Sequence, residues 1–219
     1  TSGSTCGISP ITVSGNTFGG SATSVTVTEN GFGSITTGST SNTSPFSFTY
    51  TPAAGDIGNV VTITVTTNNP SGAPCAPAIS TYTLTVNAIP TITATTPGSR
   101  CGTGTVNLGA TASGGTINWY ADPTGGTLLG SGTSFTTPII STTTTYYVDA
   151  TQNGCTTASR TAVVATVNEI PTITGSTPAS RCGPGTVNLG ATASGGTINW
   201  YATINGGSSL GTGTSFTTP

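Results

Sequence analysis

Cysteine offers the most reactive side chains in this sequence, because histidine, lysine and methionine are absent. The five cysteines fall in a pattern of two, two and one, at Cys6, Cys75, Cys101, Cys155 and Cys182. No CxxC pair or histidine accompanies them, which argues against a zinc site, and widely spaced cysteines in a threonine- and glycine-rich chain indicate disulfides and an oxidising compartment. We predict the pairs Cys6–Cys75 and Cys101–Cys155, with reduced buried thiols as the alternative.

The residues needed for catalysis or metal binding are not gathered anywhere in the sequence. Without histidine and lysine, no Ser-His-Asp, Cys-His or lysine nucleophile can be assembled. Paired-acid hydrolysis and calcium binding both need carboxylates held close together. The five acids are scattered instead, at Glu29, Asp56, Asp122, Asp149 and Glu169. Glu169 lies in a linker that calcium could stiffen, but it has no acidic companion, and we expect no catalytic, cofactor or metal site.

Charge is scarce, and this excludes several classes of partner. Only 4% of the residues are charged, with Lys+Arg 3 and Asp+Glu 5. Three arginines cannot build the basic surface that nucleic acid or anionic lipid would require. The apolar runs are far shorter than the roughly 18 residues of a membrane-spanning helix. Alternating Val, Ile and Thr favour a folded all-β chain over disorder.

The sequence repeats itself with a period of 81 residues. Trp119 recurs as Trp200, and TVNLGATASGGTINWYA is identical at 105–121 and 186–202. A fixed period of domain length indicates an array of modules. The expected domains are residues 1–88, an Ig-like module that could lack its first strand, residues 89–169, one full repeat, and residues 170–219, the N-terminal part of a second copy.

Each module reads as an immunoglobulin-like β-sandwich. About seven short strands, bounded by Gly, Asn or Pro, fit within the repeat. Alternation points Ile117 and Trp119 to one face and Asn118 and Tyr120 to the other. Trp119 and its counterpart Trp200 are therefore the expected core tryptophans.

The same alternation sets the faces of the predicted strand at 144–151. Tyr146 and Val148 should point inward, whereas Tyr147 and Asp149 should face solvent. Asp149 should then lie near Arg160 on the outer face, in a pair that contributes at most about 1 kcal/mol.

Two pairs of surface residues are weak binding candidates. Tyr120 and Tyr201, predicted to face outward at equivalent positions, could stack on sugars or on a neighbouring subunit, but each could simply cover its own sheet. Arg100 and Arg181 could bind an anionic sugar, although capping of nearby backbone carbonyls is favoured.

The connections between modules are short and contain proline. TVNAIPTIT at 85–93 and TVNEIPTIT at 166–174 join the last strand of one module to the first strand of the next. Such a linker lacks glycine, and its proline fixes φ, so neighbouring modules should keep a preferred orientation. We expect a rod.

These residues carry a resemblance to a known family. RCGTGTVNLGATASGGTINWYADPTGG, TSFTTPIISTTTTYYVDATQNGC and VVATVN, within residues 89–219, resemble the Ig-like repeat of large Bacteroidetes cell-surface proteins. Residues 1–88, with PITV, FTYTPAAGDIG and TLTVN, are similar to another Ig-like module of those proteins. Such proteins carry a sorting domain for type IX secretion and include gliding-motility adhesins. The resemblance implies an extracellular location at the cell surface.

Three functions are consistent with these features. The first is a non-catalytic stalk or fibre segment of a large adhesin, whose partners are neighbouring Ig-like domains or neighbouring subunits. The second is a module that binds surface polysaccharide, and the third is a spacer in a secreted glycan-degrading enzyme. Near-identical copies favour the stalk, because spacing needs copies whereas binding needs a particular groove.

The third module has no counterparts of the strands expected at 144–151 and 160–168. The expected partner of Cys182 would fall at position 236, 81 positions after Cys155. We expect the sequence to be a window from a longer, processed polypeptide, with completion by a strand from a neighbouring subunit as the alternative.

Overall fold

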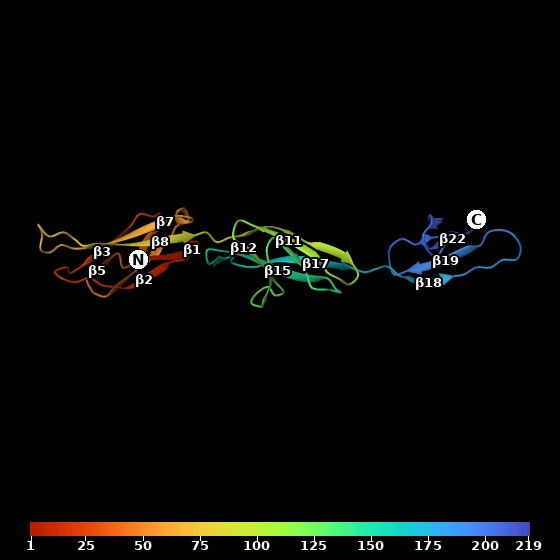
Figure 1. Ribbon diagram of the computed structural model, residues 1–219, viewed down its shortest axis with the longest axis horizontal. Helices are drawn as coiled ribbons and strands as arrows, with labels where there is room; N and C mark the ends of the chain where they lie inside the picture. Colours follow the sequence, from red (N-terminus) through yellow and green to blue (C-terminus); the bar gives the residue numbers. More distant parts are fainter.

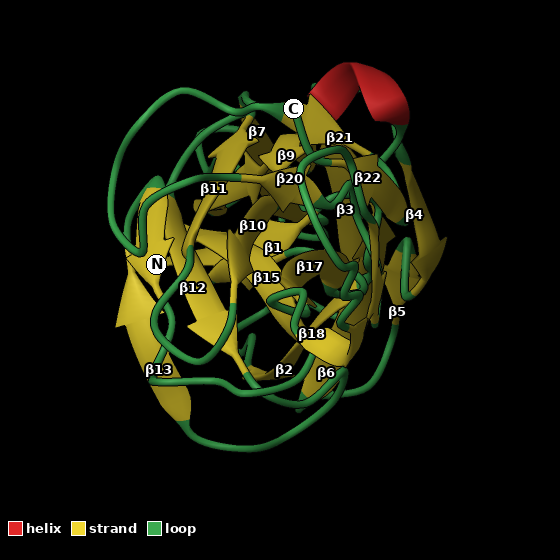
Figure 2. Ribbon diagram, turned by 90° about the vertical axis from the view of Figure 1, so that its right-hand side faces the viewer, coloured by secondary structure: helices red, strands yellow, loops and turns green.

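The computed structural model describes residues 1–219, and nearly all of its regular structure is β-strand. The strands form three modules that follow one another along the long axis, with β1–β8 at one end and β18–β22 at the other (Figure 1). One turn of 3-10 helix, η1 (Ala54–Asp56), lies at the rim of the view along this axis (Figure 2). The prediction of tandem all-β modules is confirmed.

The first module is a sandwich of two sheets. The larger sheet has the order β1 (Ser2–Cys6), β8 (Ile79–Asn87), β7 (Val60–Thr67), β3 (Val25–Glu29) and β5 (Thr40–Ser41). The smaller sheet has the order β2 (Ile11–Asn16), β6 (Phe46–Thr51) and β4 (Ser34–Thr37). Phe48 and Tyr50 of the smaller sheet pack with Ile63 and Leu84 of the larger sheet in one buried cluster.

The second module repeats this plan around Trp119. Its larger sheet has the order β10 (Gly98–Cys101), β17 (Thr161–Asn168), β15 (Thr144–Gln152), β12 (Thr116–Tyr120) and β13 (Leu128–Ser131), with β16 (Cys155–Thr156) beside β15. Its smaller sheet contains β14 (Ser134–Thr136), β11 (Asn107–Ala112) and β9 (Ile92–Thr96). Trp119 is fully buried, stacks on Phe135 at 5.3 Å between ring centroids, and donates its indole N–H to the Gly132 carbonyl at 2.9 Å.

Both complete modules contain one parallel strand pair. β1 runs parallel to β8 and places Cys6 beside Asn87, whereas β10 runs parallel to β17 and places Cys101 beside Asn168. In each case the cysteine therefore lies where the chain leaves the module for the next one.

The third module contains five short strands. They are β18 (Ile173–Thr177), β19 (Asn188–Ala193) and β22 (Ser215–Thr217) in one sheet, and β20 (Asn199–Trp200) and β21 (Gly211–Thr212) in the other. The pairing of Leu189 with Phe216 repeats that of Leu108 with Phe135, 81 positions earlier. No strand of the 219 residues corresponds to β15 or β17 in this module.

The two tryptophans consequently differ in burial. Trp200 keeps the stacking partner Phe216 at 5.5 Å between ring centroids and donates its indole N–H to the Gly213 carbonyl at 2.9 Å. It is only half-buried, however, because β15 packs beside Trp119 and nothing takes that place beside Trp200. The expectation of equal burial for the two indoles does not hold.

Replacing Trp119 by Ala should destabilise the second module by about 3–5 kcal/mol, because it leaves a large cavity in a closed core. The matched change Trp200→Ala should cost the third module clearly less, because its indole already contacts solvent. Urea unfolding followed by NMR signals assigned to each module measures both values. Equal costs for the two substitutions would contradict this description of the cores.

Candidate functional site

The feature of this structure with the most evident functional consequence is the junction between the first two modules. Cys6 is the last residue of β1, and the parallel pairing of β1 with β8 brings it beside Asn87. The next residue, Gly7, has φ of 57°, a left-handed value that favours glycine, and donates its N–H to the Asn87 carbonyl at 2.8 Å. Cys6 is thereby held at the exit end of the first module.

The second module contributes a tight hairpin to the same junction. β15 and β16 are joined at Gln152 and Cys155, which pair directly across the ladder. The turn residues Asn153 and Gly154 have φ of 50° and 79°, as a two-residue hairpin turn requires. Cys155 follows the turn and is buried at 1% exposure.

A disulfide joins Cys6 to Cys155 across the junction. The two Cα atoms are 5.7 Å apart, within the usual range for this bond, and the residues are separated by 149 positions in sequence. Beside it, the Asn87 side-chain amide donates to the Asn153 carbonyl at 3.4 Å. The first two modules are therefore connected twice, once by the backbone and once by the disulfide.

The predicted disulfide pairs, Cys6–Cys75 and Cys101–Cys155, are wrong. Cys75 lies in the loop before the nine-residue strand β8, whereas Cys6 lies beside the far end of that strand, which is about 26 Å long at 3.3 Å per residue. Cys101 is separated from Cys155 in the same way by the length of β17. Cys75, Cys101 and Cys182 are free and exposed.

The linker of the first junction is anchored on both sides of Pro90. The proline itself is buried. Thr91 donates its N–H to the Ser113 hydroxyl at 3.0 Å, and Ser113 returns its N–H to the Thr91 carbonyl at 2.9 Å. The start of the second module is thus fixed immediately after the proline.

Asp149 is buried rather than solvent-facing. The Asn118 side-chain amide donates to its Oδ1 at 3.0 Å, and Arg160 Nε donates to its Oδ2 at 3.2 Å. Arg160 also donates to the carbonyls of Asp122 and Gly125, at 2.8 and 2.6 Å. The pair predicted on the outer face exists, but Arg160 covers the carboxylate and fastens the loop after β12, which simple strand alternation could not predict.

The tyrosine candidates do not form equivalent surfaces. The guanidinium of Arg160 lies 3.3 Å from the centroid of the Tyr120 ring, so one face of this ring is occupied. Tyr201 is 52% exposed. Arg100 donates to the carbonyls of Gly102 and Thr105 at 3.0 and 3.1 Å, and Arg181 donates to that of Thr186 at 3.4 Å. Both arginines thus bind nearby backbone carbonyls, as was favoured over binding of an anionic sugar.

The burial of one carboxylate in the first module, that of Asp56, was not predicted from the sequence. Asp56 accepts hydrogen bonds from the Tyr50 hydroxyl at 2.8 Å and from the N–H groups of Phe32 and Ala53 at 2.7 and 2.9 Å. Burial alone would raise the pKa of Asp56, but these hydrogen bonds outweigh it and lower the pKa below its ordinary value. Burial and the Asp56 carboxylate together raise the pKa of Tyr50. The only sequence signal was the acid placed six residues after an inward-facing tyrosine.

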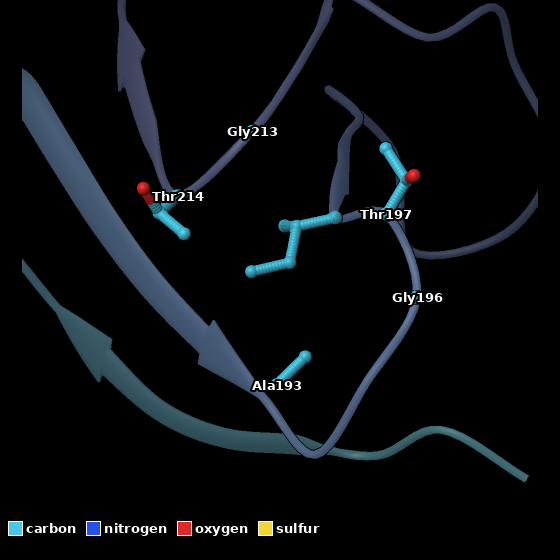
Figure 3. A pocket seen from close by; sticks show the side chains of 6 residues that line it. Ala193, Gly196, Thr197, Gly213 and Thr214 are labelled. Carbon is cyan, nitrogen blue, oxygen red and sulfur yellow. The ribbon is translucent and has the colours of Figure 1, made fainter.

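The cavities of the third module belong to its open core. Ala193, Gly196 and Thr197 lie across from Gly213 and Thr214 around a hollow of about 320 Å³ (Figure 3). At the matching positions of the second module, Thr116 and Ile117 pair with Thr151 and Ala150 of β15. We therefore attribute this hollow to the lack of a strand corresponding to β15 in the third module, and not to a ligand.

Neither metal-ligating clusters nor membrane-crossing helices occur among the 219 residues. The Cys, Asp and Glu side chains do not gather in groups of three or more that could hold an ion. The structure has no helix with the length and hydropathy needed to traverse a bilayer.

The comparison with known families agrees with the observed β-sandwich modules. Residues 88–168 and 169–219 match the family described as "Ig-like domain CHU_C associated", which together is more than half of the chain. The chain belongs to this family. The resemblance to Bacteroidetes-type Ig-like repeats is thereby confirmed. No curated protein matches the sequence.

Solved structures similar to the chain contain tandem β-sandwich modules. An I-band fragment of titin is 12% identical, with 97% of this chain and 79% of that one covered and a TM-score of 0.49. The fibronectin(III)-like modules of Clostridium thermocellum CbhA are 16% identical, with 76% and 89% covered and a TM-score of 0.39. Sidekick-1 immunoglobulin domains 1–5 are 20% identical, with 93% and 49% covered and a TM-score of 0.38. At such scores these likenesses add nothing about function.

The buried carboxylate makes a pH-dependent prediction. Because the folded pKa of Asp56 is lower than its unfolded pKa, its contribution to stability is present above the unfolded value, near pH 4, and is lost as the pH falls through the folded value. Asp56→Asn should destabilise the first module by about 1–3 kcal/mol at pH 7, and the difference from wild type should shrink in acid.

Amide hydrogen exchange in β6 and β7 measures this effect within the first module. Asp122→Asn, at an exposed loop position, is the matched control and should change little. A penalty for Asp56→Asn that stays constant from pH 7 to pH 2.5 would contradict the assignment.

Proposed function

We propose that this chain is a non-catalytic structural segment, a stalk or spacer, of a large extracellular cell-surface protein. Its modules would be residues 1–88, 89–169 and 170–219, and its partners the neighbouring Ig-like modules. The observation that carries this proposal is the Cys6–Cys155 disulfide between modules.

Two connections between the same two modules restrict their relative motion far more than a single connection does. A backbone linker alone leaves neighbouring domains free to rotate about it, which is the ordinary behaviour of domains within a chain. The disulfide adds a second fixed point, supported by the buried Pro90 and the Asn87–Asn153 hydrogen bond. A fixed orientation serves a stalk that must hold another domain away from the cell, and the disulfide bond supports an oxidising, extracellular setting.

The surface chemistry also favours a structural role. Charged residues make up 4% of the chain, and the arginines already bind backbone carbonyls or Asp149. Few charged groups remain for recognising an ionic partner.

One observation favours the alternative of polysaccharide binding. The first module has a hollow of about 370 Å³ lined by Phe18 and Phe46, together with Val25, Ile79 and polar residues such as Asn16. Aromatic rings beside polar groups are a common surface for stacking sugars. Polysaccharide binding by the chain that is lost in Phe18→Ala would favour this alternative over the stalk.

Residual dipolar couplings test the fixed orientation. In the oxidised chain, the first two modules should report one common alignment tensor. In the double variant Cys6→Ser/Cys155→Ser, or after reduction, the two tensors should separate. The third module is an internal control, because no disulfide connects it to the second.

Two results would contradict the proposal. Different tensors for the first two modules of the oxidised chain would show that the junction is flexible despite the bond. A common tensor that survives in the double variant would show that the disulfide does not fix the orientation.

A further inference from the structure

The exposed Cys101 occupies the same structural position as the bonded Cys6. Cys6 lies beside Asn87 at the end of a parallel strand pair, and Cys101 lies beside Asn168 in the same register. The glycine after each cysteine donates its N–H to that asparagine carbonyl, at 2.8 and 2.9 Å. The second module therefore presents a thiol to its successor as the first module does.

The start of the following module is also anchored alike at both junctions. Thr91 donates to the Ser113 hydroxyl at 3.0 Å, and Thr172 donates to the Ser194 hydroxyl at 3.0 Å. The return bonds from Ser113 and Ser194 to the threonine carbonyls are both 2.9 Å. In the second module, the turn that contains Ser113 lies next to the β15–β16 hairpin, because a Cβ on Gly114 would meet the Gln152 side chain. The anchor of the linker thus recurs in the third module, whereas the space beside Gly195, the counterpart of Gly114, is open.

The two junctions differ in what covers the cysteine. At the first junction the hairpin is in place, Gly7 is buried and Cys155 is 1% exposed. At the second junction Cys101 is exposed, and beside it lies an open hollow of about 670 Å³. The residues that line this hollow include Gly102, Asn168, Glu169, Ile170, Thr172 and Ser194. These are the cysteine-bearing end of the second module, the linker and the anchor of the third.

We propose that Cys101 is the site of a second inter-module disulfide, and that its partner is the hairpin cysteine of the following Ig-like repeat. In a chain that continues the 81-residue period, this cysteine stands at position 236, the counterpart of Cys155. Its hairpin fills the hollow at the second junction. The inference deepens the stalk proposed above, but it depends on the geometry of the junction and not on the stiffness of the assembly.

The bond forms by thiol–disulfide exchange with a small-molecule disulfide such as oxidised glutathione. The thiolate of Cys101 attacks one sulfur of this oxidant and releases one glutathione thiolate, which leaves a mixed disulfide on Cys101. The thiolate of the hairpin cysteine then attacks Sγ of Cys101 and releases the second. The two cysteine thiols lose two protons and two electrons, and the oxidant becomes two molecules of glutathione.

The resulting loop would run from residue 101 to position 236 and overlap the loop from Cys6 to Cys155. Residues 101–155 would then lie within both loops. A series of such overlapping loops links every module to the next independently of the backbone linker.

A chain with a completed third repeat tests this inference. Residues 170–219 are replaced by a second copy of residues 89–169, so that the third module has the sequence of the second and places a cysteine at position 236. The control chain has serine at that position. After oxidation with glutathione, the free thiols are alkylated and the disulfides are mapped by mass spectrometry without reduction.

The expected result is a peptide pair that joins Cys101 to the cysteine at position 236, with loss of Cys101 alkylation and glutathionylation. In the serine control Cys101 should remain reactive. The NMR spectrum of the control tests whether the third module is folded. A second chain, with residues 139–169 added after Pro219, also places a cysteine at position 236 and tests the same disulfide independently.

Three results would overturn the inference: a reactive Cys101 in the completed chain, pairing of Cys101 with Cys75 or with the cysteine at position 182, or a disulfide-linked dimer of two molecules. The thiol map reports the bond alone. The proposed second disulfide can therefore be disproved while the dipolar couplings still support a stiff first junction. Equally, the second disulfide can be found while the couplings show a flexible first junction.

Discussion

The parallel pairing of the first edge strand with the last strand is the constraint on which the arrangement of this molecule depends. Because β1 runs with β8, Cys6 reaches the end of the module at which the chain departs, only three residues before Pro90 in the partner register. An antiparallel neighbour would leave that cysteine at the opposite end, out of reach of the next module. One strand direction therefore decides whether a cysteine closes a loop within a module or links two modules.

The sheets themselves rely on apolar cores and hydroxyl pairs, with few charges. Threonine side chains bond across strands, as in Thr12 with Thr49, Thr93 with Thr111 and Thr151 with Thr156, each at 2.9 Å. Such cross-strand pairs stabilise a sheet without ionisable groups. Salt screens exposed ion pairs but leaves these contacts unaffected, so the stability of the sheets should depend little on ionic strength. Asp56 and the Asp149–Arg160 pair are the exceptions, and both are shielded from solvent.

Local patterns predicted the strands well and their distant partners poorly. The alternation of inward- and outward-facing residues along a strand placed Trp119 and Val148 in the core, and the 81-residue period identified the repeated module. The disulfide partners were missed because a parallel pair such as β1 with β8 has no connecting turn to show it in the sequence. Asp149 was placed in solvent because alternation gives the face of a side chain but not what covers it, and Arg160 lies just before a separate strand, β17. Cys155 directly after an Asn-Gly turn was the available signal, since hairpin tips commonly project from the end of a sandwich.

Single-molecule force spectroscopy tests most directly whether the disulfide carries load between modules. When the chain is pulled from its two ends, force passes from Cys6 to Cys155 through the bond, and the 149 positions between them cannot extend. Without reductant, the full extension should be short by about 500 Å, at roughly 3.4 Å per residue. Reductant should restore this length in one step after bond cleavage. Full extension of all 219 residues by the oxidised chain would contradict the account.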